Sequence, residues 1–215
     1  NASTRLYFSP TTNYVGSSAS ALTLRAWDQT SGAAGSKVDT SSTGGITAFS
    51  SAADGVDVTV TAVNDAPVVT TSGSMLAYTE NDAATVVDSG LTVSDVDSAT
   101  LASATVSITA GFASGQDVLA FTNQNGITGS WSAGTGVLTL SGSASLANYQ
   151  TALRSVTYLN SSEAPSTATR TVSFVVSDGG ASSAAATRDI TVTAVNDAPV
   201  VTATGSTLAY TENDP

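Results

Sequence analysis

The 215-residue sequence contains no cysteine and no histidine. Without these residues it cannot carry a cysteine nucleophile, a Ser-His-Asp triad, a zinc finger or an imidazole metal site. Basic residues are also scarce, since 6 Lys+Arg stand against 17 Asp+Glu and the formal net charge is -11. This charge disfavours nucleic acids and anionic membrane surfaces as partners, and it favours cations.

Long hydrophobic runs are absent as well. No stretch approaches the roughly 18 consecutive apolar residues of a membrane span, and the first residues show no basic-then-apolar signal region, so we expect no membrane insertion. The chain is nevertheless 41% hydrophobic, which is enough to build a core without disulfides. The lack of cysteine suits a secreted bacterial surface protein, although cytosolic proteins also avoid disulfides.

An internal repeat organises the sequence. The segment VTVTAVNDAPVVTTSGSMLAYTEND at 58–82 recurs at 190–214 with 21 of 25 positions identical, at an offset of 132. The repeat unit is therefore a domain of about 130 residues. We predict one complete repeat over 66–197, the C-terminal part of a preceding repeat over 1–65, and the first strand region of a third over 198–215.

Residues 1–65 match the later strands of the complete repeat at an offset of 150. The aligned pairs are Leu22 with Val172, Leu24 with Phe174, Ala26 with Val176, and Asp28 with Asp178. Between Gln29 and Gly55 the first copy carries about 18 extra residues, rich in Ser, Thr, Gly and Ala. Such an insertion indicates a surface loop, and we favour a passive length variant over a binding loop.

Period-two alternation of apolar residues dominates the chain, as in 56–63 and 170–176. Short alternating runs bounded by Gly, Ser, Asn and Asp predict an all-β, Greek-key sandwich in tandem copies. One segment differs, because Ser145 can cap a turn in which Leu146, Tyr149 and Leu153 are spaced by three and four. We therefore expect one short helix per repeat, over 145–153.

The acidic residues flank the ends of the predicted strands. A sandwich has only two ends, so carboxylates that adjoin alternate strand ends are brought together and repel each other unless a cation bridges them. Calcium meets this need, because it binds six to eight oxygens from carboxylates, Asn side chains and carbonyl groups in irregular geometry. The alternative is ordinary turn chemistry, since Asp and Asn favour loops without any metal.

Two runs, YTENDAATVVDSGLTVSDVDS and FVVSDGGASSAAATRDITVTAVNDAP, resemble the cadherin repeat over the whole complete copy. That family has a Glu-Asn pair, an Asp-x-Asp pair fifteen residues later, an Ala-x-Asp-x-Gly segment and an Asn-Asp linker before a Pro. The VNDAP linker with SLANYQTALRSVTYLN is similar to the cadherin-like and immunoglobulin-like modules of very large bacterial adhesins.

The resemblance implies calcium sites at both ends of the complete repeat. At the N-terminal end it implies Asp95, Asp97 and Asp178, which would meet the linker residues Asn64 and Asp65. At the C-terminal end it implies Glu80, which would point toward Asn196 and Asp197. The linkers lack further acids and no counterpart of the Asp-Arg-Glu motif lies near Arg154, so we expect fewer or weaker calcium ions than in a full cadherin junction.

Two functions fit these features, and neither is enzymatic, because a short tandem sandwich seldom encloses two opposed carboxylates in a cleft. The first is an extracellular, calcium-stiffened spacer at the cell surface, which partners neighbouring repeats and supports cell or biofilm adhesion. The second is a recognition or self-assembly module that binds surface glycans or like chains. A grouped, exposed aromatic patch near Trp131 would favour the second; otherwise Trp27 and Trp131 are core or edge packing.

Overall fold

The computed structural model describes residues 7–203 together with 205, 207 and 212. The chain divides into two compact units, residues 1–63 and 64–215. Half of the predicted opening of a third repeat, residues 198–215, lies outside the described residues.

The first unit contains an antiparallel pair of strands, β1 (Gly16–Leu24) and β2 (Asp54–Val60). Residues 25–53 connect the two strands, and an isolated bridge joins Trp27 to Phe49 within this connection. The insertion is largely exposed, including the side chains of Val38 and Ile46. All hydrophobic residues of the described chain that are fully buried lie between Val69 and Val192, outside this unit.

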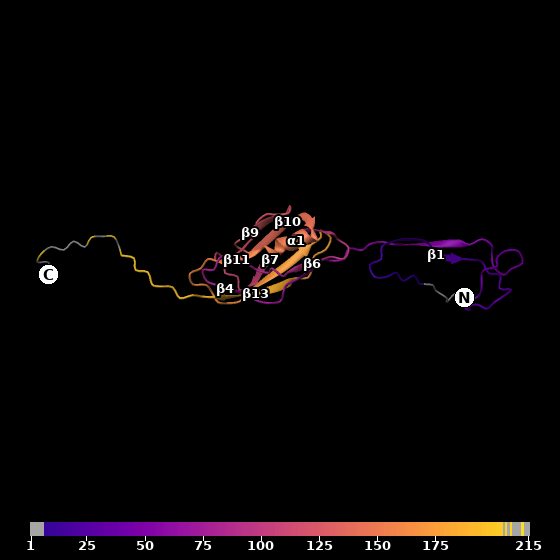
Figure 1. Ribbon diagram of the computed structural model, residues 1–215, viewed down its shortest axis with the longest axis horizontal. Coiled ribbons are helices and arrows are strands. Elements are labelled where there is room, and N and C mark those ends of the chain that lie inside the picture. The colour runs from indigo at the N-terminus through magenta and orange to yellow at the C-terminus, as the bar shows by residue number, and fades with distance from the viewer. Residues whose placement is uncertain (1–6, 204, 206, 208–211, 213–215) are drawn as a thin grey trace. The chain divides into compact units, whose positions relative to one another are not determined.

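The second unit is an all-β sandwich with one short helix (Figure 1). Its strands are β3 (Val68–Thr70), β4 (Leu76–Thr79), β5 (Thr85–Val86), β6 (Thr92–Ser94), β7 (Thr100–Ala110), β8 (Asp117–Ala120), β9 (Thr128–Ser132), β10 (Val137–Ser145), β11 (Thr157–Asn160), β12 (Arg170–Ser177) and β13 (Ala186–Thr193). They form a six-stranded sheet in the order β4-β13-β12-β7-β10-β9, a three-stranded sheet β5-β11-β8 and a two-stranded sheet β3-β6. The predicted fold class is thus confirmed.

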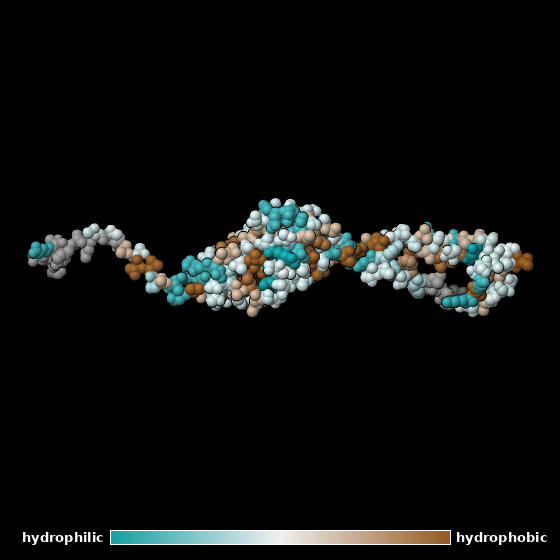
Figure 2. All heavy atoms as spheres, in the orientation of Figure 1, coloured by the Kyte–Doolittle hydropathy of each residue, from teal (hydrophilic) through white to brown (hydrophobic). Residues whose placement is uncertain are grey.

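The core follows from alternation along the strands. In β7 the side chains of Ala104, Val106 and Ile108 are buried, and their neighbours are less so. The two main sheets meet where Tyr78 of β4 packs edge-on against Tyr158 of β11, with ring centroids 5.0 Å apart. The visible face of this unit in Figure 2 is mostly white and teal with scattered brown patches, as expected when alternation sends apolar residues inward.

The predicted helix is present as α1 (Leu146–Arg154). The Ser145 hydroxyl accepts a hydrogen bond from the Asn148 backbone N–H, which caps the first turn. Tyr149 and Leu153 are fully buried, and the helix contacts β6, β7 and β10. The apolar spacing in the sequence therefore identified both the helix and its buried face.

The arrangement of the strands determines which acidic side chains meet at each end of the sandwich. β4 runs parallel to β13, so both strands end at the same edge of the sheet. At the opposite end of the unit, the turn after β6 and the turn after β12 both lie near the chain entering at Asn64, as the hydrogen bonds described below show. These are the two places where the acidic residues gather.

Candidate cation site at the ends of the sandwich

At the N-terminal end, Asp95 and Asp97 form the turn that follows β6. One oxygen of Asp95, Oδ1, accepts hydrogen bonds from the backbone N–H groups of Asp97 (3.1 Å) and Ser98 (2.9 Å). The other, Oδ2, is buried and has no hydrogen-bond partner. A buried carboxylate oxygen without a donor is costly, so this turn retains capacity for a ligand.

Asp178 builds the second turn at this end, directly after β12. Its Oδ1 accepts from the backbone N–H groups of Gly180 (2.6 Å) and Ala181 (2.7 Å), and its Oδ2 accepts from the side-chain amide of Asn64 (2.9 Å). The hydrogen bonds from Ala181, Asn64 and Gly180 lower the pKa of Asp178 below its ordinary value. The side chain is therefore held as a carboxylate.

The incoming linker completes this end. The backbone N–H of Asp65 donates to Asp97 Oδ2 at 3.0 Å. Hydrogen bonds thus link all five residues that the sequence analysis assigned to this end, which are Asn64, Asp65, Asp95, Asp97 and Asp178. Their carboxylates do not, however, form a group of three oxygens within metal-ligating reach in the described part of the chain.

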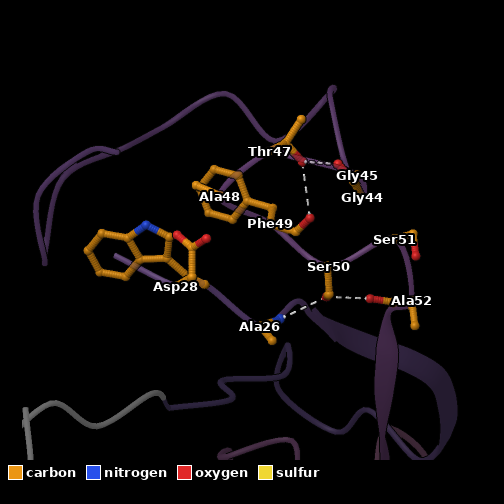
Figure 3. A pocket seen from close by; sticks show the side chains of 11 residues that line it. Ala26, Asp28, Gly44, Gly45, Thr47, Ala48, Phe49, Ser50, Ser51 and Ala52 are labelled. Atoms are coloured by element: carbon orange, nitrogen blue, oxygen red, sulfur yellow. Dashed lines mark hydrogen bonds between the residues drawn. The ribbon is translucent and has the colours of Figure 1, made fainter. Parts of the chain in front are cut away.

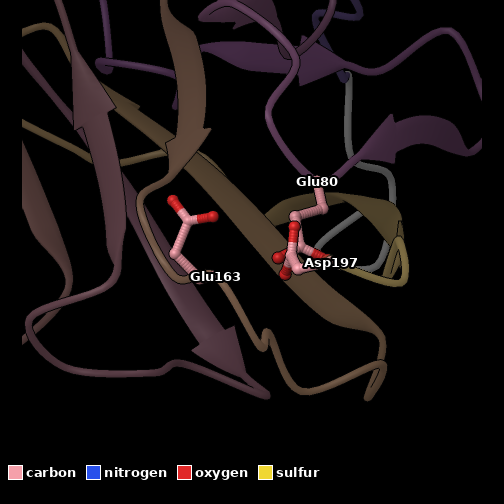
Figure 4. Close-up of side chains that lie close together, drawn as sticks. All are labelled: Glu80, Glu163 and Asp197. Carbon is pink, nitrogen blue, oxygen red and sulfur yellow. The ribbon is translucent and has the colours of Figure 1, made fainter. Parts of the chain in front are cut away.

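At the C-terminal end, three carboxylates do converge. Glu80 follows β4, Glu163 comes from the loop after β11, and Asp197 lies in the outgoing linker (Figure 4). One oxygen from each of these residues lies within 4.8 Å of the others. Within the described part of the chain, this is the group of three acidic side chains close enough to share a metal ion.

Glu80 is the unusual member, because its residue is only 4% exposed. Its Oε2 accepts a hydrogen bond from the Val195 backbone N–H at 2.6 Å, while its Oε1 is buried and has no partner. Glu163 and Asp197 are exposed at the mouth of the cluster. The arrangement is a buried carboxylate clustered with two solvent-accessible carboxylates.

No basic side chain of the described second unit neutralises this cluster. Arg154 donates to the Leu91 carbonyl, Arg170 pairs with Asp117, and Arg188 pairs with Asp88. Three acids without a basic partner, one of them buried, form a site for a hard cation, which prefers carboxylate oxygens. This cluster of three acidic residues can hold a metal ion.

The structure also shows what the sequence analysis missed and how its other residues are used. Glu163 was not predicted, since it lies in a loop of Ser, Ala and Pro with no ligand spacing. Asn196 was predicted, yet its amide donates to the Asp197 carbonyl at 3.2 Å. The Asn64 amide donates in the same way to the Asp65 carbonyl at 3.2 Å, so the two linkers contain the same local hydrogen bond.

Among the residues that the structure describes, no grouped, exposed aromatic patch lies near Trp131. Trp131 is half-buried and packs edge-on against Phe112, with ring centroids 6.3 Å apart. A hollow of about 560 Å³ lies in the insertion of the first unit and is lined by Trp27, Asp28 and Phe49 among others (Figure 3). Asp28 has a lowered pKa because the hydroxyl and backbone N–H of Thr30 donate to it.

A curated relative was found for part of this sequence. It is halomucin of Haloquadratum walsbyi, which is 41% identical over 124 residues, covering 55% of this chain. The match spans 1% of the length of halomucin, and no family model matches the chain. Among the described residues, no helix has the length and apolar character needed to cross a membrane.

Proposed function

We propose that the chain is a non-enzymatic spacer from a large extracellular surface protein, whose repeats are stiffened by calcium where they join. The observation that carries the proposal is the buried carboxylate of Glu80, which has one oxygen without a hydrogen-bond partner and lies in a cluster with Glu163 and Asp197. A carboxylate in that position is stabilised by a cation and by little else. Calcium fits because the available donors are all oxygen and the geometry is irregular.

The position of the site supports a role in stiffening. Glu80 and Glu163 belong to the body of the sandwich, whereas Asp197 belongs to the linker. An ion that binds all three would hold the linker against the sandwich. The same VNDAP sequence occurs at 63–67 and 195–199, so a long array would present the same junction many times.

The wider setting is supported by the relative and by the composition. Similarity to a segment that is 1% of halomucin, together with a β-rich repeat, fits a module of a surface protein. We therefore propose an extracellular location, neighbouring repeats as partners and a contribution to adhesion or biofilm formation. The cadherin-like character of the module belongs to the same proposal, since its acidic residues occupy both ends of the sandwich.

The test is calcium binding by the full chain, measured by isothermal titration calorimetry after treatment with chelator. We expect binding that Glu80→Gln weakens at least tenfold, because this change removes the buried charge and keeps the shape. Asp54→Asn is the matched control, since Asp54 is an exposed acid in β2 outside both ends. Absence of calcium binding by the parent chain, or equal binding by Glu80→Gln, would refute the proposal.

A second candidate function, saccharide recognition, is favoured by the hollow beside Trp27 in the insertion. An aromatic face with a nearby carboxylate suits the apolar and hydroxyl faces of a sugar. Fluorescence titration with bacterial oligosaccharides in a Trp131→Phe background reports on Trp27 alone. A saturable shift that Phe49→Ala removes would support recognition, and an unchanged spectrum would leave the spacer function.

A further inference from the structure

The hairpin of the first unit is equivalent to the last hairpin of the complete repeat. Adding the sequence offsets, 150 for β1 and 132 for β2, converts the cross-strand pairs of one hairpin into those of the other. These pairs are Leu22–Val56 and Leu24–Asp54 in β1–β2, and Val172–Arg188 and Phe174–Ala186 in β12–β13. Agreement in register means that the same side chains face the same side of the sheet in both hairpins.

The two hairpins differ in what covers them. Val172 and Phe174 are 0% exposed, because the second unit packs its other strands over them. Their equivalents in the first unit, Leu22 and Leu24, are 36% and 45% exposed, and Val56 is 43% exposed. An apolar face of this kind, on an isolated two-stranded ribbon, is marginal in water and favours a partner.

The residues of the first unit that approach this face do not cover it. Tyr7 and Phe8 line a hollow of about 260 Å³ together with Leu22, Val56 and Val58. Tyr7 is itself 84% exposed and Phe8 is 50% exposed. The described part of the unit contains no third strand, so the outer edge of β2 also keeps unpaired backbone groups.

We propose that β1–β2 is the closing hairpin of its repeat and a docking surface for opening strands with a sequence like that of residues 66–82. In the second unit this edge is filled by β4, which runs parallel to β13 and places Ala77 opposite Thr191. Subtracting the offset of 132 places the docked alanine opposite Thr59 of β2. The proposal is independent of the calcium site.

The opening strands suit this surface better than other occupants do. β13 pairs with β4 through residues 190–193, ITVT, and the equivalent residues 58–61 at the end of β2 are VTVT, so this part of β2 offers nearly the same edge that β4 occupies in the second unit. Ile190 and Val192 pair with Leu76 and Tyr78 in the second unit, and Val58 and Val60 stand in their places in the first. Strand addition of this type gains main-chain hydrogen bonds along the edge and side-chain contacts on alternate residues.

The experiment is disulfide trapping, which is clean because the chain has no cysteine. The full chain with Thr59→Cys is mixed, in chelator and mild oxidant, with a synthetic peptide of residues 66–82 that carries Ala77→Cys. The matched control is Thr23→Cys, an exposed threonine of β1, the strand equivalent to β12. We expect the Thr59→Cys adduct to form at least tenfold faster than the Thr23→Cys adduct and at least tenfold faster than with a scrambled peptide.

Each other outcome overturns the proposal. Equal rates at the two positions, or equal rates with the scrambled peptide, would mean that the edge of β2 has no preference for these strands. Faster formation of Thr59→Cys homodimers than of the peptide adduct would assign the surface to a second copy of the hairpin instead.

Discussion

We expect Glu80→Gln to raise the stability without calcium and to reduce the gain in stability that calcium gives. Without calcium, the parent chain keeps a buried carboxylate oxygen without a donor and two further carboxylates within 4.8 Å. Glutamine removes one charge, keeps an oxygen for the Val195 N–H, and offers an amide to the exposed carboxylates. Repulsion at this separation is about 1 kcal/mol per pair in water, so the variant should be about 1–2 kcal/mol more stable than the parent in chelator.

With calcium the comparison changes. Extracellular modules bind calcium with dissociation constants of roughly 0.1–1 mM, so 10 mM calcium is about 10- to 100-fold above the dissociation constant. Linkage then stabilises the parent chain by about 1.4–2.7 kcal/mol. The variant lacks the buried ligand, and a tenfold loss of affinity should reduce its gain to about 0.4–1.4 kcal/mol.

The assay is urea unfolding with 10 mM calcium and with chelator, followed by the fluorescence of Trp131 in a Trp27→Phe background. Trp131 lies half-buried in the second unit beside Phe112, so it reports on the unit that holds the cluster. Asp54→Asn should show the full calcium increment of the parent. A parent chain with the same unfolding curve in both solutions, or a variant that keeps the increment, would refute the reasoning.

Three further predictions test the sandwich itself by urea unfolding. Phe174→Ala should cost about 3–5 kcal/mol, whereas Leu24→Ala, at the equivalent exposed position, should cost under about 1 kcal/mol. Arg170→Met should cost about 3–5 kcal/mol, because it leaves Asp117 buried without its 3.2 Å ion pair. Burial favours a raised pKa for Asp88, but hydrogen bonds and Arg188 lower the pKa overall. Asp88→Asn should therefore reduce the free energy of unfolding by about 2–4 kcal/mol at pH 7. The difference in stability between the two proteins should vanish as the pH falls below about 3.9 and through the lowered pKa of Asp88.

The sequence predicted the local features of the fold well, because each had a local signal. Alternation marked the strands, and the Ser145 cap with apolar residues at spacings of three and four marked the helix. The turns at Asp95 and Asp178 were also recognisable, since both follow a strand and are bonded by nearby backbone N–H groups. These features depend on neighbours within a few residues.

Features that depend on the pairing of distant strands were not predicted. Arg170 begins an alternating strand on the same face as Val172, yet nothing local indicates that Asp117 lies 3.2 Å from its Nε. Tyr158 donates to the same carboxylate at 2.6 Å, and burial followed by this bond raises the pKa of the tyrosine. Glu163 was not predicted for the same reason, since only the arrangement of the sheets brings its loop close to Glu80.

The parallel pairing of β4 with β13 explains why Glu80 and Asp197 of the acidic cluster come together. Parallel strands end at the same edge, so Glu80, which follows β4, lies beside Val195 and Asp197, which follow β13. Glu80, near the start of the repeat, thus lies beside the linker through which the chain leaves the repeat. An ion bound there requires both that β4 is docked and that the linker is in place, because each supplies a ligand. Under the proposed function, calcium bound there would stabilise the edge of the sandwich and the direction of the linker together, which is what a stiff array of repeats needs.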